Sequence, residues 1–195
     1  MSEQATASKV EEIVLNGVNV SKLVDTIELI KENAEIAKFK FRASNKWLIG
    51  GHNRSNIKDF YGACQEDTSR EKPFVFDNDE PPVLLGENNG ANPVEFILHA
   101  IAGCITTTFV YYAAVHVVKI DEIESSYEGD LDVRGMLGLP GRTEVGYEQI
   151  RVTFKVKSDA PKEKLEELID LAQKRSPAAN SVMNPVPVSI SLETK

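Results

Sequence analysis

The feature that most constrains this chain is the stretch from Phe96 to Val118, in which no residue carries a formal charge. Its apolar side chains point in every direction around a 3.6-residue period, which is typical of a helix buried on all sides. Asn92 followed by Pro93, with Glu95 three residues after Asn92, forms a helix start of the capping-box type. The sequence therefore predicts a long central helix enclosed by the rest of the chain.

This stretch is also long enough to span a bilayer, which takes about 20 apolar residues. A membrane span is disfavoured by the polar side chains within it, namely His99, His116 and the threonines at 106–108. The chain on either side is strongly charged. A central helix wrapped by sheets is the better interpretation, so we expect no membrane partner.

The charge balance argues against nucleic acid as a partner. The 195 residues include 22 basic and 30 acidic ones, a formal net charge of −8, without a cluster of Lys and Arg. Proteins whose main task is to bind nucleic acid or an anionic membrane need a basic face. A hydrophobic content of 42% is enough for a full core, so we expect a globular protein without a nucleic-acid partner.

The cysteines and the N-terminus indicate a compartment. The two cysteines, Cys64 and Cys104, lack the Cys/His spacing of a zinc site, and residues 1–9 lack the apolar segment of a signal peptide. The expected location is the reducing cytoplasm. There, a free cysteine is either a small core residue or a reactive thiol.

The sequence offers no cofactor or metal site. The acidic residues Asp77, Asp79 and Glu80 precede Pro81 in a segment that reads as a solvated loop rather than a cation site. The chain has no nucleophile elbow, no glycine-rich phosphate loop and no His-Glu metal motif. We therefore expect neither a cofactor nor a metal.

The chain divides into an N-terminal extension with one helix, residues 1–35, and a main domain, residues 36–195. Residues 1–10 are small and polar, which predicts disorder. Asn16-Gly17 forms either a two-residue hairpin turn or a loop that leads into a helix. Ser21 is a suitable N-cap for a helix to about residue 33.

The main domain has the pattern of an α+β fold. Strands are predicted where apolar and polar residues alternate, and helices where apolar residues recur every three or four positions. The predicted elements around the central helix are strands at 37–42, 47–49 and 57–63, with a turn at 45–46 before the second of them, a long ordered loop at 66–91, a hairpin of strands at 123–133 and 150–156, a helix at 159–175 and an edge strand at 186–192. Gly129 is expected to interrupt the first strand of the hairpin, and Pro177 either ends the late helix or begins a short one capped by Ser176. The prediction is antiparallel sheets wrapped around a long buried helix.

Cys104 is the residue with the clearest chemical potential. It lies within the central helix among small apolar residues, where a cysteine is most simply a small hydrophobic residue. A buried thiol in mid-helix is hard to ionise, so a reactive Cys104 requires a cation nearby. The candidates are Arg42 and Arg54, with Glu95 as the carboxylate that would hold a guanidinium. Two histidines, His99 and His116, are further candidates. Each either acts as an acid or base or is a hydrogen-bonded structural residue.

Several motifs together resemble the OsmC/Ohr family, the osmotically inducible and organic hydroperoxide resistance proteins. They are Pro73-Phe74-Val75-Phe76-Asp77-Asn78-Asp79-Glu80-Pro81, Leu84-Leu85-Gly86, Asn92-Pro93-Val94-Glu95 through Ala102-Gly103-Cys104, Glu128-Gly129-Asp130-Leu131-Asp132, Ser176-Pro177 and Asn184-Pro185-Val186-Pro187-Val188. The resemblance covers roughly residues 36–193. It implies an intertwined homodimer in which two long central helices are enclosed by sheets from both chains.

The resemblance also implies a chemistry and roles for particular residues. Members of the family reduce organic hydroperoxides: a thiolate attacks the O–O bond, becomes a sulfenic acid and is captured by a second cysteine. Cys104 matches the attacking cysteine and Glu95 the carboxylate that orients the activating arginine, which would be Arg42 or Arg54. The second cysteine of the family usually precedes a proline, and that position is Ser176 here.

Because serine cannot form the disulfide, three outcomes are open. Cys104 is recycled by an external thiol or dithiol, or Cys64 captures the sulfenic acid, or the protein has lost the activity and binds a ligand instead. The expected function is a thiol-dependent peroxidase that reduces organic or fatty hydroperoxides through a single reactive cysteine. The alternative is a non-catalytic, stress-associated or ligand-binding dimer in which Cys104 is part of the core.

Overall fold

The computed structural model describes residues 12–141 and 145–194, so the disorder predicted for residues 1–10 lies outside the described residues. The elements in chain order are β1 (Val14–Leu15), β2 (Val18–Asn19), α1 (Val20–Glu32), the 3-10 helix η1 (Ala34–Ala37), β3 (Ser44–Ile49), β4 (His52–Ile57), β5 (Phe60–Gly62), β6 (Gln65–Asp67), β7 (Phe74–Asn78), the 3-10 helix η2 (Pro82–Leu84), α2 (Pro93–Val115), β8 (Glu122–Leu131), α3 (Val133–Met136), β9 (Tyr147–Lys157), α4 (Lys162–Arg175) and α5 (Pro177–Met183). The predicted α+β class, with antiparallel sheets and a long central helix, is confirmed.

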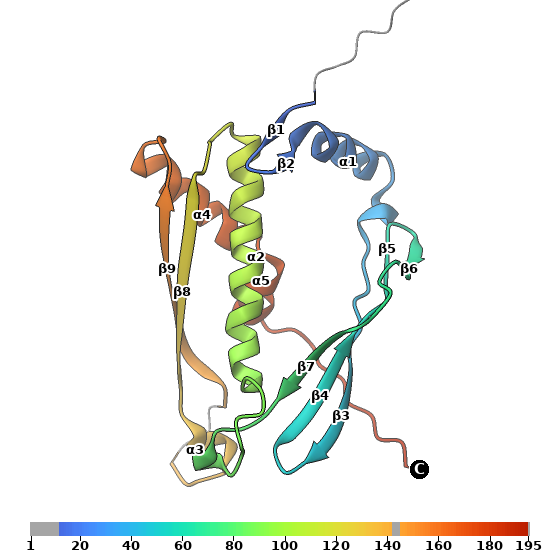
Figure 1. Cartoon of the computed structure of the whole chain (residues 1–195), viewed down its shortest axis with the longest axis vertical. Helices are drawn as coiled ribbons and strands as arrows, with labels where there is room; N and C mark the ends of the chain where they lie inside the picture. Colours follow the sequence, from blue (N-terminus) through green and yellow to red (C-terminus); the bar gives the residue numbers. More distant parts are fainter. Residues whose placement is uncertain (1–11, 142–144, 195) are drawn as a thin grey trace, which may run out of the picture.

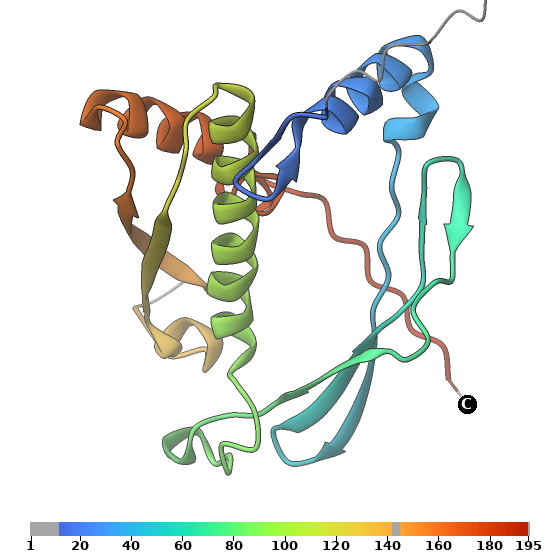
Figure 2. The same cartoon turned by 45° about the horizontal axis from the view of Figure 1, so that its top comes forward.

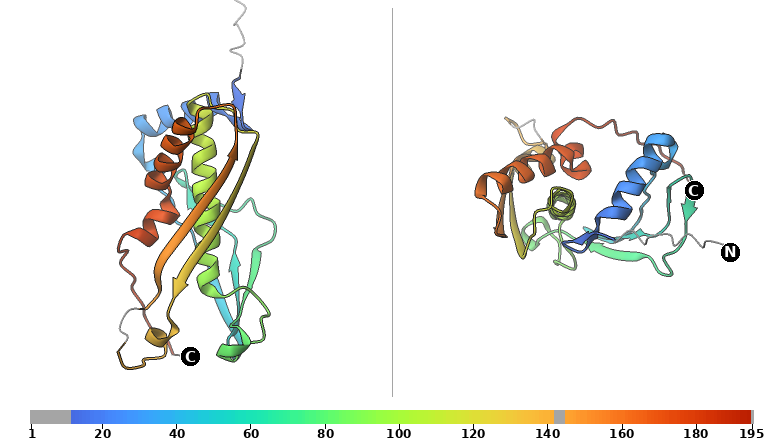
Figure 3. Two further views of the ribbon diagram at one scale, coloured as in Figure 1. Left: turned by 90° about the vertical axis from the view of Figure 1, so that its left-hand side faces the viewer. Right: turned by 90° about the horizontal axis from the view of Figure 1, so that it is seen from above.

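The elements form two parts, one that includes α2 and packs on one side of it, and one that lies on the opposite side of α2 (Figure 1). We call α2, β8, β9, α4 and α5 the C-terminal body, and α1, η1 and β3 to β7 the N-terminal limb. Seen from above, α2 stands between α4 with the β8–β9 hairpin on one side and α1 with the limb on the other (Figure 3). The limb is joined to the body by the loop before α2 at one end and by the β1–β2 hairpin at the other (Figure 2).

The buried core belongs to the C-terminal body. On α2, buried residues recur every fourth position, at Ile101, Ile105, Phe109 and Ala113, and they pack with Leu168 of α4. A stripe with this spacing is the face that an amphipathic helix presents to a core. Burial of each large side chain contributes about 1.5–3 kcal/mol, so this stripe holds α2 against α4 and the β8–β9 sheet.

The β8–β9 hairpin was predicted correctly because apolar and polar residues alternate along its strands, and the structure places the two kinds on opposite faces. One face carries apolar residues that pack on the core, including Tyr127 and Phe154. The other face pairs acidic residues of β8 with basic residues of β9, at Glu122 with Lys157, Glu124 with Lys155 and Glu128 with Arg151. Opposite charges on facing positions stabilise this register. The predicted interruption at Gly129 is wrong, because β8 is continuous from Glu122 to Leu131.

The prediction that α2 is buried on all sides is wrong for the single chain. Its stripe at Ile97, Tyr111 and Val115 is exposed, because the limb that faces it stands apart from most of its length. Phe76 of β7 reaches Phe96 near the start of α2, with 5.8 Å between ring centroids. By its length and composition alone, α2 could span a membrane. Within the single chain, 17% of its apolar 18-residue stretch is buried.

Three predictions for the limb are corrected. In place of the strand predicted at 37–42, Ala37 ends the 3-10 helix η1 and the residues after it form an extended segment with a single bridge, Lys40 with Tyr61. The ring of Phe39 stacks on Phe60, and that of Phe41 is tilted against it. The strand expected at 57–63 is divided between the end of β4 and β5. The long loop expected at 66–91 contains β6 and β7, and β7 pairs with β4. These strands are rich in Asn, Asp and Ser, so their composition resembles that of a loop and their pairing decides their structure.

The edge strand predicted at 186–192 does not form in the single chain. Its apolar residues are exposed, up to 93% at Ile190. The segment leaves α5 and runs toward the limb without joining a sheet (Figures 1 and 2). A strand needs a partner edge for its backbone hydrogen bonds, and no described strand of the chain provides one here.

The N-terminal hairpin is confirmed at Asn16-Gly17, and it anchors the extension to the body. The side chain of Asn16 donates to the carbonyl of Val118 at 2.9 Å and accepts from the amide of Ile120 at 2.8 Å. Helix α1 begins slightly before the prediction, with Asn19 as its N-cap in place of Ser21. No residue of α1 is buried.

Candidate functional site

The start of α2 has all the capping contacts that its sequence predicts. The side-chain oxygen of Asn92 accepts from the amide of Val94 at 3.0 Å, and Glu95 Oε2 accepts from the amide of Asn92 at 2.8 Å. Asn92 Nδ2 also donates to Glu80 at 2.6 Å. These contacts satisfy backbone amides that a helix start leaves unpaired, and they place Glu95 at a defined position in the first turn.

The loop before α2 is organised by one buried carboxylate. Asp79 is 2% exposed and accepts from the amides of Glu80, Glu87 and Asn89 and from the side chain of Asn89. These hydrogen bonds, that from the Asn89 amide first, lower the pKa of Asp79 to about 2 against the opposing effect of burial. Gly86 passes so close to the Glu80 carbonyl that a Cβ would lie 1.8 Å from its oxygen. The acidic segment is therefore an ordered turn that sets the entry to α2.

Cys104 lies on α2 where α5 begins. Its Sγ accepts from the backbone amide of Ala178 at 3.5 Å, and it is partly exposed. Ser176, which matches the position of the second cysteine of the resembled family, is fully buried and caps α5, as predicted, by accepting from the amide of Ala179 at 3.3 Å. The structure thus brings Cys104 close to the segment that carries Ser176, from 74 residues away along the chain.

A largely apolar cavity of about 480 Å³, with Glu148, Gln149 and Gln173 as its polar lining, opens beside this turn of α2, and Cys104 itself is not among its lining residues. Ile101 and Ile105, which flank Cys104 in sequence, form one wall, and β9, α4 and α5 form the others. Its volume is in the range of small-molecule sites. Such a cavity favours an apolar molecule, because a polar one would lose hydrogen bonds on entering it.

The structure does not bring the two candidate arginines to Cys104 or Glu95 within one chain. Arg42 pairs with Glu66 through two hydrogen bonds of 2.8 and 2.7 Å. Arg54 donates to Asp77 at 2.9 and 3.2 Å. The pKa of each guanidinium is raised, most of all by its hydrogen bond to Glu66 for Arg42 and to Asp77 for Arg54, so both arginines stay charged.

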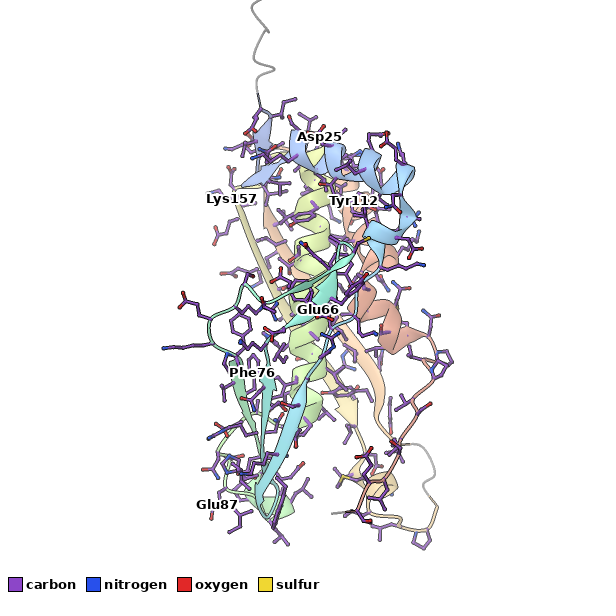
Figure 4. The ribbon with its side chains drawn as sticks, turned by 90° about the vertical axis from the view of Figure 1, so that its right-hand side faces the viewer. Asp25, Glu66, Phe76, Glu87, Tyr112 and Lys157 are labelled. Atoms are coloured by element: carbon purple, nitrogen blue, oxygen red, sulfur yellow. The ribbon has the colours of Figure 1, made fainter. Side chains whose placement is uncertain are left out.

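Asp77 also contacts His52 Nε2 at 2.9 Å. The pKa of Asp77 is lowered, most of all by the hydrogen bond from Arg54 and next by that from His52. Residues paired across β4 and β7 share a face, so Arg54 and Asp77 lie on the face opposite to Ser55 and Phe76. Since Phe76 contacts α2, Arg54 points away from α2 of its own chain. Figure 4 shows Glu66 of the limb in front of α2, Phe76 lower down on β7, and Glu87 at the bottom in the loop that leads to α2.

The remaining candidates lie apart from Cys104. Cys64 is exposed in the turn between β5 and β6, in the N-terminal limb, with a φ of 65°. The ring of His99 contacts Phe96 edge to face, with 6.4 Å between centroids, and His116 is the C-cap of α2. Within the described residues, no group of three His, Cys, Asp or Glu side chains could hold a metal ion.

Sequence reasoning missed Tyr147 near the first turn of α2. Its hydroxyl donates to the carbonyl of Val94 at 2.9 Å, and it lines the apolar cavity. Burial and then the charge of Glu95 raise its pKa, so the phenol remains a donor. The glycine at 129 was a partial signal, because a Cβ there would lie 2.4 Å from the Tyr147 ring.

Comparison with known proteins agrees with this architecture. The family described as OsmC-like protein matches residues 86–191. Among solved structures, an OsmC-like protein from Mycoplasma pneumoniae is 18% identical with a TM-score of 0.56, over 74% of this chain and 87% of its own. An OsmC-like protein of unknown function from Vibrio cholerae is 13% identical with a TM-score of 0.51, over 73% and 92%.

An organic hydroperoxide resistance protein OsmC from Legionella pneumophila is 17% identical with a TM-score of 0.49, over 73% of this chain and 88% of its own. No curated protein matches the chain. The family match covers more than half of the 195 residues and includes α2 with Cys104, the β8–β9 hairpin, α4 and α5. The chain belongs to the OsmC-like family.

Proposed function

We propose that the protein is a thiol-dependent peroxidase for organic or fatty hydroperoxides, with Cys104 as the nucleophile. The observation that carries the proposal is the position of Cys104, whose Sγ accepts from the Ala178 amide at 3.5 Å, on the turn of α2 whose residues Ile101 and Ile105 line a largely apolar cavity of about 480 Å³. The Ala178 amide points at the sulfur atom that would attack the peroxide. The cavity favours the apolar part of a hydroperoxide over hydrogen peroxide.

The reaction proceeds in two stages. The Cys104 thiolate attacks the terminal oxygen of ROOH, the O–O bond breaks, and the leaving alkoxide takes a proton to give ROH and a sulfenic acid at Cys104. An external thiol then condenses with the sulfenic acid, releasing water and forming a mixed disulfide. A second external thiol attacks that disulfide and restores Cys104, so that two thiols are oxidised to one disulfide for each hydroperoxide.

The reductant is proposed to be an external thiol or dithiol, in keeping with a reducing cytoplasm. Ser176 lies two residues before Ala178, whose amide donates to Cys104, but a serine cannot form the family's intramolecular disulfide. Cys64 lies in the limb, on a different element from Cys104. It would act as the resolving cysteine only through a second copy or a movement of the limb.

The working unit is proposed to be a homodimer. The stripe on α2, the limb and the segment 186–192 expose large apolar side chains, which is typical of surfaces that another protein covers. Neither Arg42 nor Arg54 contacts Cys104 in its own chain, so the activating guanidinium would come from a second copy. The segment 186–192 alternates apolar and polar residues and would find its partner edge there too.

The test is consumption of a lipid-like hydroperoxide with dithiol reductants, together with mass spectrometry of a trapped sulfenic acid. We expect both signals to vanish in Cys104→Ser and to persist in Cys64→Ser. If Arg42 or Arg54 is the activating residue, its replacement by Met lowers kcat/KM about 100-fold, as for other preorganised donors in active sites, and the other variant is the matched control. Absence of turnover and of a trapped species in the wild type would overturn the proposal.

A second candidate is a dimer that binds an apolar ligand without reducing it. Ser176 is the observation that favours it, because the two-cysteine cycle of the resembled family is incomplete. Binding of a fluorescent fatty acid without hydroperoxide consumption would support this candidate. Loss of that binding in Ile105→Trp, which narrows the cavity, would locate the ligand.

A further inference from the structure

Tyr147 connects two elements that are far apart in the chain. It is the first residue of β9, and its hydroxyl donates to the carbonyl of Val94 in the first turn of α2, 53 residues away, at 2.9 Å. Val94 is the residue before Glu95. The hydrogen bond therefore joins the sheet of the C-terminal body to the turn that carries the family-matched carboxylate.

The sheet is built to hold the Tyr147 ring in this direction. The pairing of β8 with β9 shifts register between Asp130 and Leu131, and such a bulge re-aims the side chains next to it. The ring lies over Gly129, where a Cβ would be 2.4 Å from a ring carbon. Any larger residue at 129 would therefore push the ring away from Val94.

Glu95 has one oxygen available for a partner. Its Oε2 accepts from the amide of Asn92, and Oε1 has no hydrogen-bond partner among residues 12–141 and 145–194. Burial first and the Glu95 charge second raise the pKa of the Tyr147 phenol, whose hydroxyl donates to the carbonyl of the residue before Glu95. The other charged group tied to this turn is Glu80, which accepts from Asn92. A change in the position of this turn would move the free Glu95 oxygen.

We propose that Tyr147 is a positioning residue that fixes the first turn of α2, and with it the free oxygen of Glu95, for the reaction of Cys104. This inference rests on the proposed function. The hydroxyl acts through Glu95, the carboxylate that would hold the activating guanidinium of a second copy, and does not touch the reacting sulfur. Because a hydrogen bond of this kind contributes about 1 kcal/mol, its loss should change the reactivity of Cys104 about five-fold.

The test is a double-mutant cycle of Tyr147→Phe and Glu95→Gln in a Cys64→Ser background, read as the alkylation rate of Cys104 by iodoacetamide against pH. Tyr147→Phe keeps the ring over Gly129 and removes only the hydroxyl. We expect a rate about five-fold lower and a higher pH midpoint in each single variant, and no further change in the double variant.

The matched control is Tyr127→Phe. The Tyr127 hydroxyl is buried without a hydrogen-bond partner among the described residues, so its removal should leave the alkylation rate unchanged. Equal effects of Tyr147→Phe with and without Glu95, or no effect of either variant, would overturn the inference. Alkylation does not require peroxidase activity, so a failure of the proposed function appears separately, as absence of hydroperoxide consumption by the wild type.

Discussion

The C-terminal body and the N-terminal limb are stabilised in different ways. The buried apolar cluster lies entirely between Ile101 and Ala179. In the described part of the limb no large apolar side chain is buried, and Phe41 is 70% exposed. The limb is held by strand pairing and by ion pairs such as Arg42 with Glu66 and Arg54 with Asp77, and surface ion pairs contribute about 0–1 kcal/mol each.

The described part of the chain therefore contains one buried core, in the C-terminal body, and an exposed apolar surface on the limb that no part of the same chain covers. The body follows the usual rule that an apolar stripe of a helix packs against a sheet and other helices. The limb exposes aromatic residues on strands whose other face is polar. A second copy of the chain is the cover that we propose.

The largest effect is expected in the body, at Phe109, which is 0% exposed. Phe109→Ala should lower the free energy of unfolding by about 3–5 kcal/mol, because it removes buried apolar surface and leaves a cavity. Urea unfolding followed by circular dichroism measures the change. A loss below about 1 kcal/mol would mean that the cluster around α2 does not dominate stability.

The second effect tests the limb, at Phe41. If the limb were free in solution, Phe41→Ala would change stability by no more than about 0.5 kcal/mol. With a second copy over the limb, we expect a loss of about 1.5–3 kcal/mol and a wild-type midpoint that rises with protein concentration. Urea unfolding at two concentrations and sedimentation of the native protein decide between them. A monomer with a concentration-independent midpoint would contradict the proposed cover.

The third effect concerns the loop between limb and body, at Asp79. Its folded pKa of about 2 is below the ordinary value of 3.8, so its contribution to stability is present above about pH 4 and is lost as the pH falls through 2. Asp79→Asn should lower the thermal midpoint by several degrees at pH 7 and flatten its dependence between pH 4 and 2. Glu87→Gln, at an exposed carboxylate of the same loop, is the control. Parallel pH profiles of wild type and Asp79→Asn would refute the assignment.

The smallest effect on stability is expected at Ser176. Ser176→Cys replaces a buried hydroxyl that accepts one hydrogen bond, so the loss should be about 1 kcal/mol. One equivalent of an organic hydroperoxide should then produce a disulfide with Cys104, seen by mass spectrometry without reduction. Ser181→Cys, on the same helix, should form none. Absence of the disulfide in Ser176→Cys would mean that α5 does not present this position to Cys104.

The parts of the site that sequence reasoning predicted depend on contacts between near neighbours. Asn92, Pro93 and Glu95 lie within one turn, so their capping contacts could be read from the residue types. The same holds for Ser176 at the start of α5 and for the Asn16-Gly17 turn. The β8–β9 hairpin was predictable because β8 alternates between inward and outward residues along its length and β9 does so from Ile150 to Lys157.

The parts that could not be predicted depend on partners far away in the chain. β4 and β7 are strands because they pair with each other, although residues such as Asn53 and Asp77 are typical of loops. The segment 186–192 has the alternation of a strand but finds no partner edge among the described strands.

Residue types and their spacing were enough to predict the central helix, its N-terminal cap and the hairpin that follows, and to indicate Cys104 as the candidate reactive residue. The contact of the Ala178 amide with Cys104 and the hydrogen bond from Tyr147 to the Val94 carbonyl depend on the tertiary structure. The tertiary structure also decided that the two arginines pair with carboxylates of the limb. The physical reason is range: caps, turns and periodicity act over a few residues, whereas these contacts exist only after separate elements have packed.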